Sequence, residues 1–266
     1  MTLPPITNKQ HEILRLIYRY RFIDRKQLQF FMHHKDKRLV LSWLKDLKAK
    51  GYIKWIYDAS DFANKTKPAV YYIALNGVRY LRSAGDYPPE ELRKRYKEST
   101  RQPSFIEKCL LLAECCTNIE SRIVGGTHYS YATAADYGDT ANQYHALSEL
   151  QPSMCFTKSV TTPESVNTTN YLLEIFDVTT PRYMVKKRLI EYVNFLEEGD
   201  WEQNSRDIIA PIVLIACVST AELIYAKRRA QRLLAGALNT SEIHIRFATF
   251  EKIRGLGVTG AIWEEA

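Results

Sequence analysis

The chain has 266 residues, 45% hydrophobic and 25% charged, a composition that excludes an extensively disordered protein. No apolar run reaches the ~18 residues that cross a bilayer, and the N-terminus does not read as a signal peptide, so we expect a cytoplasmic protein with no membrane partner. The formal charge of +7 is unevenly spread: residues 1–101 hold 22 Lys and Arg against 10 Asp and Glu, and residues 102–266 hold 15 against 20. A basic segment of this kind attracts polyphosphates such as nucleic acids.

Three helices are predicted in the basic segment. The first covers Thr7–Tyr20, with its first residue, a threonine, as N-cap, and the second covers Arg25–Met32 after an aspartate N-cap. The third covers about Lys35–Lys50 and ends at Gly51, because glycine accepts a left-handed C-cap without strain. Five apolar residues are expected on the inner face of this third helix: Leu39, Val40, Trp43, Leu44 and Leu47.

Two strands and a closing helix are predicted next. The strands cover Tyr52–Tyr57 and Ala69–Ala74, and a polar stretch containing Lys65 and Lys67 joins them. A short helix over Asn76–Leu81 follows. Three helices followed by a two-stranded hairpin form one consistent order, in which each local signal supports the next.

The runs RLVLSWLKDLKAKGYI (Arg38–Ile53) and YYIALNGVRYL (Tyr71–Leu81) make this segment similar to the winged helix-turn-helix domains of bacterial regulators. The resemblance implies a DNA-binding domain over residues 1–84, with double-stranded DNA as partner. The side chains opposite the buried stripe of the third helix would then reach base edges, Lys48 a phosphate, and Lys65 and Lys67 the backbone or minor groove. The expected base-reading residues are Lys37, Arg38, Leu41, Ser42 and Lys45. The alternative is a winged helix that contacts protein.

Residues 85–103 are predicted to be a linker, since Gly85, Pro88 and Pro89 interrupt regular structure. The basic run RKRYK (Arg93–Lys97) within it is either part of a solvated connector or an additional phosphate contact.

Residues 104–266 alternate between helices and apolar strands, a pattern typical of an α/β mixed-sheet domain. We expect helices at Phe105–Cys116, Tyr183–Leu196 and Ala221–Leu234, and strands at Met154–Thr157, Tyr171–Val178, Ile209–Val218 and Ile243–Phe250. The five cysteines include no CxxC pair and the six histidines are scattered, so we expect buried free thiols and no zinc site.

The order of these elements resembles the PD-(D/E)xK restriction-endonuclease-like fold, whose enzymes use two acids and a lysine around a metal ion. Here Glu174 keeps one acid, but Ser153 stands where the other belongs and Phe176 where the lysine belongs. The possible stand-ins are the acids Asp177 and Glu114 and the lysines Lys186 and Lys187, and Glu174 itself is the remaining member of this vestigial set. We therefore expect a non-catalytic domain without metal or cofactor, in which Glu174 pairs with a nearby lysine or arginine. The alternative is a metal-dependent nuclease whose active site has migrated.

The basic winged helix is followed by QPSMCF, YLLEIFDVTT, KKRLIEYVNF, PIVLIACVST and RFATFEKI. Together these motifs resemble the plasmid replication-relaxation family, found on conjugative plasmids and other mobile elements. The resemblance implies DNA binding in replication, relaxation, transfer or their regulation. We further expect that residues 104–266 mediate assembly, as a homodimer or with plasmid replication or transfer proteins. A transcription regulator whose sheet domain senses a ligand remains an alternative.

Overall fold

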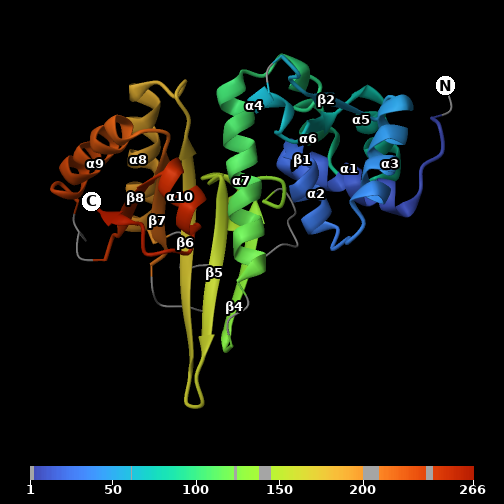
Figure 1. The fold of residues 1–266 in the computed structure, drawn as a ribbon. Coiled ribbons are helices and arrows are strands. Elements are labelled where there is room, and N and C mark those ends of the chain that lie inside the picture. The colour runs from blue at the N-terminus through green and yellow to red at the C-terminus, as the bar shows by residue number, and fades with distance from the viewer. Residues whose placement is uncertain (1–2, 61, 123–124, 138–144, 200–209, 238–241) are drawn as a thin grey trace. The chain divides into compact units, whose positions relative to one another are not determined.

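The structure is a computed structural model that describes residues 3–60, 62–122, 125–137, 145–199, 210–237 and 242–266. It divides into two compact units, Met1–Ala113 and Glu114–Ala266, each of which combines helices with a β-sheet (Figure 1). The predicted α+β class is therefore confirmed. The boundary between the units falls inside α7 (Pro103–Ser121). No helix in the described ranges combines the length and the apolar character needed to cross a membrane.

The first two helices of the first unit, α1 (Asn8–Tyr20) and α2 (Arg25–Phe31), both begin with a capping box. Thr7 and Asp24 each accept a hydrogen bond from the backbone N–H of a glutamine three residues later, and the side chain of that glutamine accepts one from the backbone N–H of the cap. Each box satisfies backbone donors that have no partner within the helix. Both predicted N-caps are confirmed.

The third helix, α3 (Lys37–Ala49), is capped by Asp36 and ends before Gly51, whose φ of +72° confirms the predicted left-handed stop. Its buried stripe consists of Val40, Leu44 and Leu47, spaced by four and three residues.

The prediction that Leu39 lies on the inner face of α3 is wrong, because its side chain is 42% exposed. Neighbouring residues of a helix point about 100° apart, so a stripe centred on Val40, Leu44 and Leu47 turns the side chain before Val40 outward. Trp43 is half-buried and meets His34 edge-on, with 5.1 Å between ring centroids.

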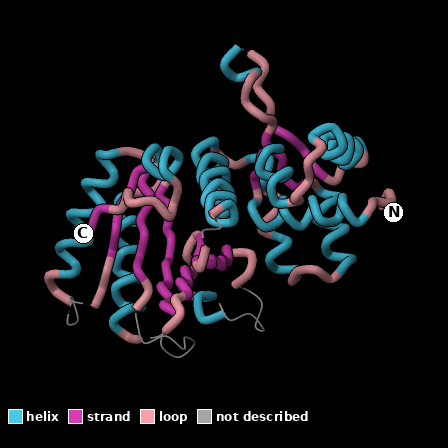
Figure 2. The backbone as a smooth tube through the Cα atoms, turned by 60° about the horizontal axis from the view of Figure 1, so that its bottom comes forward, coloured by secondary structure: helices cyan, strands magenta, loops and turns pink. Residues whose placement is uncertain are grey.

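The sheet of the first unit has three antiparallel strands in the order β1-β3-β2: β1 (Phe22–Asp24), β2 (Ile53–Ile56) and β3 (Val70–Ile73). The two predicted strands are confirmed as β2 and β3, whereas β1 was not predicted. A short helix, α4 (Phe62–Lys65), lies between β2 and β3. We call residues 53–73, from β2 to β3, the arm; Figure 2 shows its α4 end standing away from the helices of the unit.

Two further helices, α5 (Leu75–Ala84) and α6 (Pro89–Arg93), and the turn η1 (Glu98–Thr100) follow the arm. The helix predicted at 76–81 is confirmed as α5. Residues 85–103 differ from the predicted linker, because they pack into the first unit.

Three contacts tie this segment down. The Leu92 side chain is fully buried, Tyr87 stacks on Tyr18 with 3.7 Å between ring centroids, and the Arg21 Nε donates to Glu98 Oε1 over 2.8 Å. Glu98 is 2% exposed, so this ion pair is largely removed from water. The glycine and prolines of this segment interrupt the helices as expected. The partners of Tyr87 and Glu98, which are Tyr18 and Arg21, lie about 70 residues earlier in the chain.

The second unit contains one six-stranded mixed sheet in the order β4-β5-β6-β7-β8-β9. Its strands are β4 (Thr127–Thr133), β5 (Met154–Thr161), β6 (Val166–Phe176), β7 (Ile212–Cys217), β8 (Ile245–Thr249) and β9 (Glu264–Glu265). Its further helical segments are η2 (His145–Ser148), α8 (Arg182–Glu197), α9 (Thr220–Leu234) and α10 (Phe250–Leu256). The first three strands are antiparallel, β6, β7 and β8 are parallel, and β9 returns antiparallel. The helices α8 and α9 make the crossovers that parallel neighbours require.

The four strands predicted in this unit are confirmed as β5 to β8, and the two helices predicted after β6 as α8 and α9. Residue 209, the start of the third predicted strand, lies outside the described residues. Phe250 begins α10 rather than ending β8. The strands β4 and β9 were not predicted.

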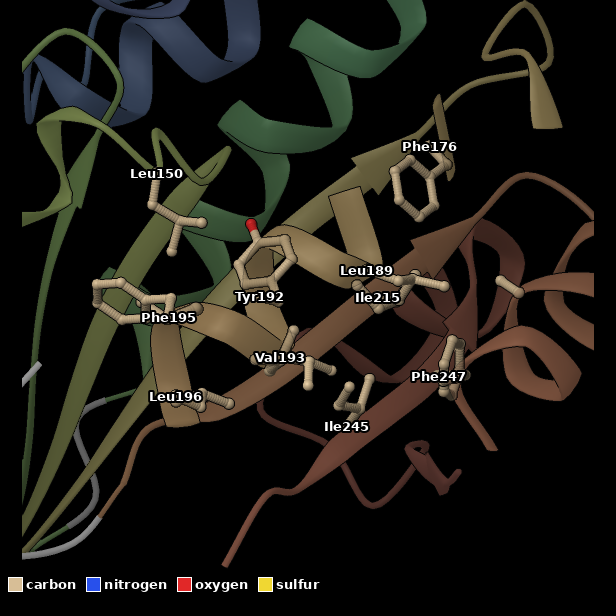
Figure 3. Close-up of a cluster of buried hydrophobic side chains, with 14 of the residues drawn as sticks. Leu150, Phe176, Leu189, Tyr192, Val193, Phe195, Leu196, Ile215, Ile245 and Phe247 are labelled. Atoms are coloured by element: carbon tan, nitrogen blue, oxygen red, sulfur yellow. The ribbon is translucent and has the colours of Figure 1, made fainter. Parts of the chain in front are cut away.

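A buried apolar cluster joins α8 and α9 to one face of the sheet (Figure 3). Leu189, Val193 and Leu196 of α8 meet Ile215 and Phe247 of the central strands there. The five cysteines are free and buried, which confirms the thiol prediction. Burial is the main cause that raises the pKa values of Cys155 and Cys217 to about 12.

Candidate nucleic-acid interface and carboxylate cluster

The outer face of α3 carries the residues predicted to read bases. Lys37, Arg38, Ser42, Lys45 and Lys48 are all exposed, and we call these five the basic face. Arg38, Ser42 and Lys45 lie opposite the buried stripe of the helix, as the 3.6-residue period requires, and Lys37 and Lys48 lie beside it. Leu41 is half-buried.

An open cleft of about 290 Å³ lies in the first unit beside α3. Leu41 and Lys67, two of the predicted residues, line it. The other lining residues come from α2 and the arm: Arg25, Lys26, Trp55, Tyr57, Thr66, Pro68, Ala69 and Tyr71. The cleft therefore brings residues of α2, α3 and the arm together at one concave surface.

Sequence reasoning missed Arg25, Lys26, Trp55 and Tyr57. The signal for the two cations was their position directly after the N-cap of α2, which fixes the first turn of that helix. No local pattern could connect either cation to the aromatic side chains of β2, because their place in one cleft depends on the β1-β3-β2 pairing.

The arm is held by contacts of its own. The Tyr57 hydroxyl donates to the Lys65 carbonyl oxygen over 3.3 Å, and the Lys48 ammonium lies 3.6 Å from the centroid of the Trp55 ring. Lys65 and Lys67 are both exposed, as predicted. The contact of Lys48 with Trp55 connects the C-terminal end of α3 to β2, and the Tyr57 hydrogen bond closes the arm on itself.

The first unit holds 23 Lys and Arg against 11 Asp and Glu. Some of its acids are already paired within the unit: Asp46 Oδ2 accepts from Lys50 Nζ over 2.7 Å and from Gln10 Nε2 over 2.6 Å. The hydrogen bond from Lys50, followed by that from Gln10, lowers the pKa of Asp46. Such pairing leaves the excess positive charge on the exposed cations, which suits a polyanionic ligand.

The second unit contains a buried cluster around Glu174 on β6. Arg188 of α8 donates to Glu174 Oε2 through Nη2 at 2.5 Å and Nε at 3.0 Å. The Tyr192 hydroxyl donates to the same oxygen over 3.0 Å, and the Ser153 hydroxyl donates to Oε1 over 3.1 Å. The side chains of Glu174 and Arg188 are 7% and 18% exposed. The prediction that Glu174 pairs with a lysine or arginine is confirmed, with Arg188 as the partner.

Further contacts hold Arg188 in place. Its Nη1 donates to the Leu150 carbonyl oxygen over 2.9 Å and to Glu191 Oε2 over 2.6 Å. Burial is the largest single effect and lowers the pKa of Arg188, but the charge of Glu174, the Tyr192 hydroxyl and the hydrogen bonds to Glu174 and Glu191 together outweigh it, so the net shift is upward. Burial, then the Glu174 charge, raises the pKa of Tyr192 well above its ordinary value. The cluster is therefore a carboxylate neutralised by an arginine, with both of its oxygens hydrogen-bonded.

The other vestigial candidates do not join Glu174. Asp177 accepts hydrogen bonds from the backbone and hydroxyl of Thr179 at 2.8 and 2.7 Å, which forms the turn before α8. Lys186 and Lys187 are exposed, and Lys187 Nζ lies 3.7 Å from Glu191 Oε1. Phe176, which stands where the PD-(D/E)xK pattern has its lysine, is buried in the apolar cluster (Figure 3). Among the described residues, no group of His, Cys, Asp and Glu is arranged to hold a metal ion.

A family model described as replication-relaxation matches residues 14–210, from within α1 to just before β7. No curated protein and no solved structure matches the chain.

Proposed function

Because the chain belongs to the replication-relaxation family, we propose that it binds double-stranded DNA in the replication or relaxation of a plasmid or another mobile element. The first unit is the DNA-binding part in this proposal. The observation that carries it is the basic face of α3, five exposed residues of which four are cations, next to a cleft that three further cations line.

A winged helix-turn-helix is the arrangement that we propose for the first unit. The order α1, β1, α2, α3, β2, β3, with the arm between the last two strands, supports it. In such a domain the third helix enters the major groove, which is about 12 Å wide and admits a helix. Arg38, Ser42 and Lys45 would then face base edges, and the arm would carry Lys65 and Lys67 to the backbone or minor groove.

The salt dependence of binding to a mixed-sequence duplex tests this proposal with the full-length protein. If about six phosphates are contacted, the affinity falls about 10³-fold between 50 and 200 mM salt. Lys45→Ala should weaken binding, whereas Lys9→Ala should not, because Lys9 is paired with Glu12 over 2.7 Å on α1. Affinity independent of salt, or equal loss in both variants, would contradict the proposal.

For the second unit we propose a PD-(D/E)xK-like fold that no longer catalyses DNA cleavage. The antiparallel β4-β5-β6 followed by parallel β6-β7-β8 supports this fold. Loss of catalysis is supported by the Arg188 guanidinium, which occupies the Glu174 oxygen that a metal ion would need. Ser153 donates to Glu174 instead of supplying a second negative charge.

A cleavage assay tests the absence of catalysis. Supercoiled plasmid incubated with the protein and Mg²⁺ or Mn²⁺ should stay intact, both with the native chain and with Glu174→Ala. Nicking by the native chain that Glu174→Ala abolishes would identify a metal-dependent nuclease and overturn this part of the proposal.

We also propose that the second unit mediates assembly, as a homodimer or with plasmid replication or transfer proteins. Its 14 Lys and Arg against 19 Asp and Glu favour a protein partner over DNA. A two-fold dimer would place two basic faces on two half-sites of one duplex. Sedimentation of a strict monomer, free and on DNA, would contradict the dimer.

A further inference from the structure

The cleft beside α3 is lined by exposed aromatic side chains, which contacts with phosphates do not need. Trp55 and Tyr57 lie two residues apart, so their side chains project to the same side of the arm. Trp55 is 40% exposed and Tyr57 47% exposed, and both line the cleft. Tyr71 is directly opposite Trp55 in the β2–β3 pair and is 2% exposed, so it forms the floor.

The three rings form a continuous row. The ring centroids of Trp55 and Tyr57 are 6.4 Å apart, and those of Trp55 and Tyr71 are 6.2 Å apart. The Tyr57 hydroxyl bond to the Lys65 carbonyl holds one end of the row in place. Rings arranged this way present flat faces and edges to a ligand that enters the cleft.

Cations surround the row. Arg25, Lys26 and Lys67 line the same cleft, and the Lys48 ammonium lies over the Trp55 ring at 3.6 Å. The cleft thus combines a flat apolar floor with positive charge at its margins. Its volume of about 290 Å³ is at the lower end for a small-ligand pocket, which suits one nucleotide rather than several.

Exposed aromatic rings beside cations are the combination that binds single-stranded nucleic acids, because bases stack on the rings while the cations follow the backbone. A closed duplex offers phosphates on its outside but keeps its base faces stacked inside. If the cleft bound only phosphates, the cations would suffice and the rings of Trp55 and Tyr57 would stay exposed to solvent.

We propose that this cleft holds an unpaired nucleotide of a DNA strand, next to the duplex bound by the basic face. The inference rests on the proposed function, since it extends the DNA site on α3. Leu41 connects the two surfaces, because it lies on α3 among the base-reading positions and also lines the cleft. A strand leaving the duplex beside α3 would place its first unpaired base against Trp55. The preferred substrate is therefore DNA with a junction between double and single strand.

Fluorescence anisotropy with two labelled DNAs tests this inference on the full-length protein. One DNA is a blunt 20-base-pair duplex, and the other is the same duplex with a single-stranded thymidine overhang. Since stacking contributes about 1–3 kcal/mol per base, the overhang should tighten binding by about 5- to 150-fold. Trp55→Ala should bring the ratio of the two affinities to about one, whatever its effect on the blunt duplex through Lys48, and Trp55→Phe should restore part of the ratio. Lys54→Ala is the matched control, because Lys54 is exposed on the same strand but does not line the cleft.

The outcomes separate the inference from the proposed function. Equal affinity of the native protein for both DNAs, or an overhang preference that survives Trp55→Ala, overturns the inference while duplex binding stands. Absence of duplex binding overturns the proposed function. Tyr57→Ala is a second variant that should also lose the preference, and its side chain is the more exposed of the two, so it keeps the test valid if Trp55→Ala does not fold.

Discussion

The basic face and cleft of the first unit and the Glu174 cluster of the second unit use charged side chains in opposite ways. In the first unit the cations of α3 and the arm are exposed around an open cleft. In the second unit Glu174 and Arg188 are buried and neutralise each other. An exposed charge is available to a ligand, whereas a buried ion pair has already used its electrostatic energy inside the protein.

This difference indicates which charged residues are available to bind a ligand and which ones stabilise the fold. In the proposed PD-(D/E)xK-like fold Glu174 would be a metal-binding acid, yet its hydrogen bonds run between β6 and α8. It therefore fastens a helix to the sheet. The basic face and the cleft make few contacts that the fold needs, so substitutions there should change binding more than stability.

The largest effect expected from this comparison is on stability, at Arg188. Arg188→Ala should lower the free energy of unfolding by about 3–5 kcal/mol, because it leaves the Glu174 carboxylate buried without its cation. Urea unfolding followed by circular dichroism measures the change. Lys187→Ala, on an exposed neighbour, should stay within about 0.5 kcal/mol. Replacing both partners, with Glu174→Leu and Arg188→Met, should recover most of the loss. A loss below about 1 kcal/mol in Arg188→Ala would mean that the cluster does not hold α8 to the sheet.

Much of this fold could be predicted because its signals are local. The N-caps Thr7 and Asp24, the stop at Gly51 and the apolar strands β7 and β8 all follow from residues within a few positions of each element. The basic face followed from the helical period alone.

The elements that the sequence did not predict depend on contacts with residues far away in the chain. The three residues of β1 form a strand only because they pair with β3, about fifty residues later. The edge strand β4, with the sequence THYSYAT, has no strong apolar alternation. Residues 85–103 looked like a linker because the partner of Glu98 is Arg21, far back in the chain. The cleft could not be predicted for the same reason.

The second prediction concerns binding, at three exposed lysines. Replacing Lys45, Lys65 and Lys67 together by alanine should weaken duplex binding about 100-fold at ~0.1 M salt, because Lys45 loses a base contact and Lys65 and Lys67 each lose a phosphate contact that contributes about 0.9 to the salt slope. Anisotropy titrations at several salt concentrations measure both quantities. The paired change Lys186→Ala with Lys187→Ala, on exposed residues of α8, should alter neither. If the triple variant is as stable as the native chain, these lysines serve binding and not the fold, unlike Arg188. A large loss of stability would contradict that difference.

The third prediction concerns the helix that supplies two cations to the cleft. Asp24→Ala should destabilise the protein by about 1 kcal/mol, because the first turn of α2 loses its side-chain cap. Asp24→Asn should be nearly neutral, since an amide oxygen also accepts the bond from Gln27. Thermal unfolding of both variants measures the difference. Equal destabilisation by Ala and Asn would indicate that the negative charge matters rather than the cap.

The smallest effect tests the surface ion pairs of the first unit. The Lys50 hydrogen bond, then that of Gln10, lowers the pKa of Asp46 in the folded state below its ordinary value of about 3.9. A lowered folded-state pKa stabilises the protein above the unfolded-state pKa, and this stabilisation is lost as the pH falls through the folded-state pKa. The Asp46 side chain is 42% exposed and screened by water, so the effect at pH 7 should stay below about 1 kcal/mol.

Asp46→Asn should therefore be slightly less stable than the native chain at pH 7, and the difference should shrink as the pH falls through the folded-state pKa of Asp46, as measured by urea unfolding over a range of acidic pH. A difference that does not change with pH would have to come from packing around Gln10, which is 2% exposed, rather than from charge. The small size of this effect beside that of Arg188→Ala follows from burial, because water screens the pair on α3 and is largely excluded from the pair on α8.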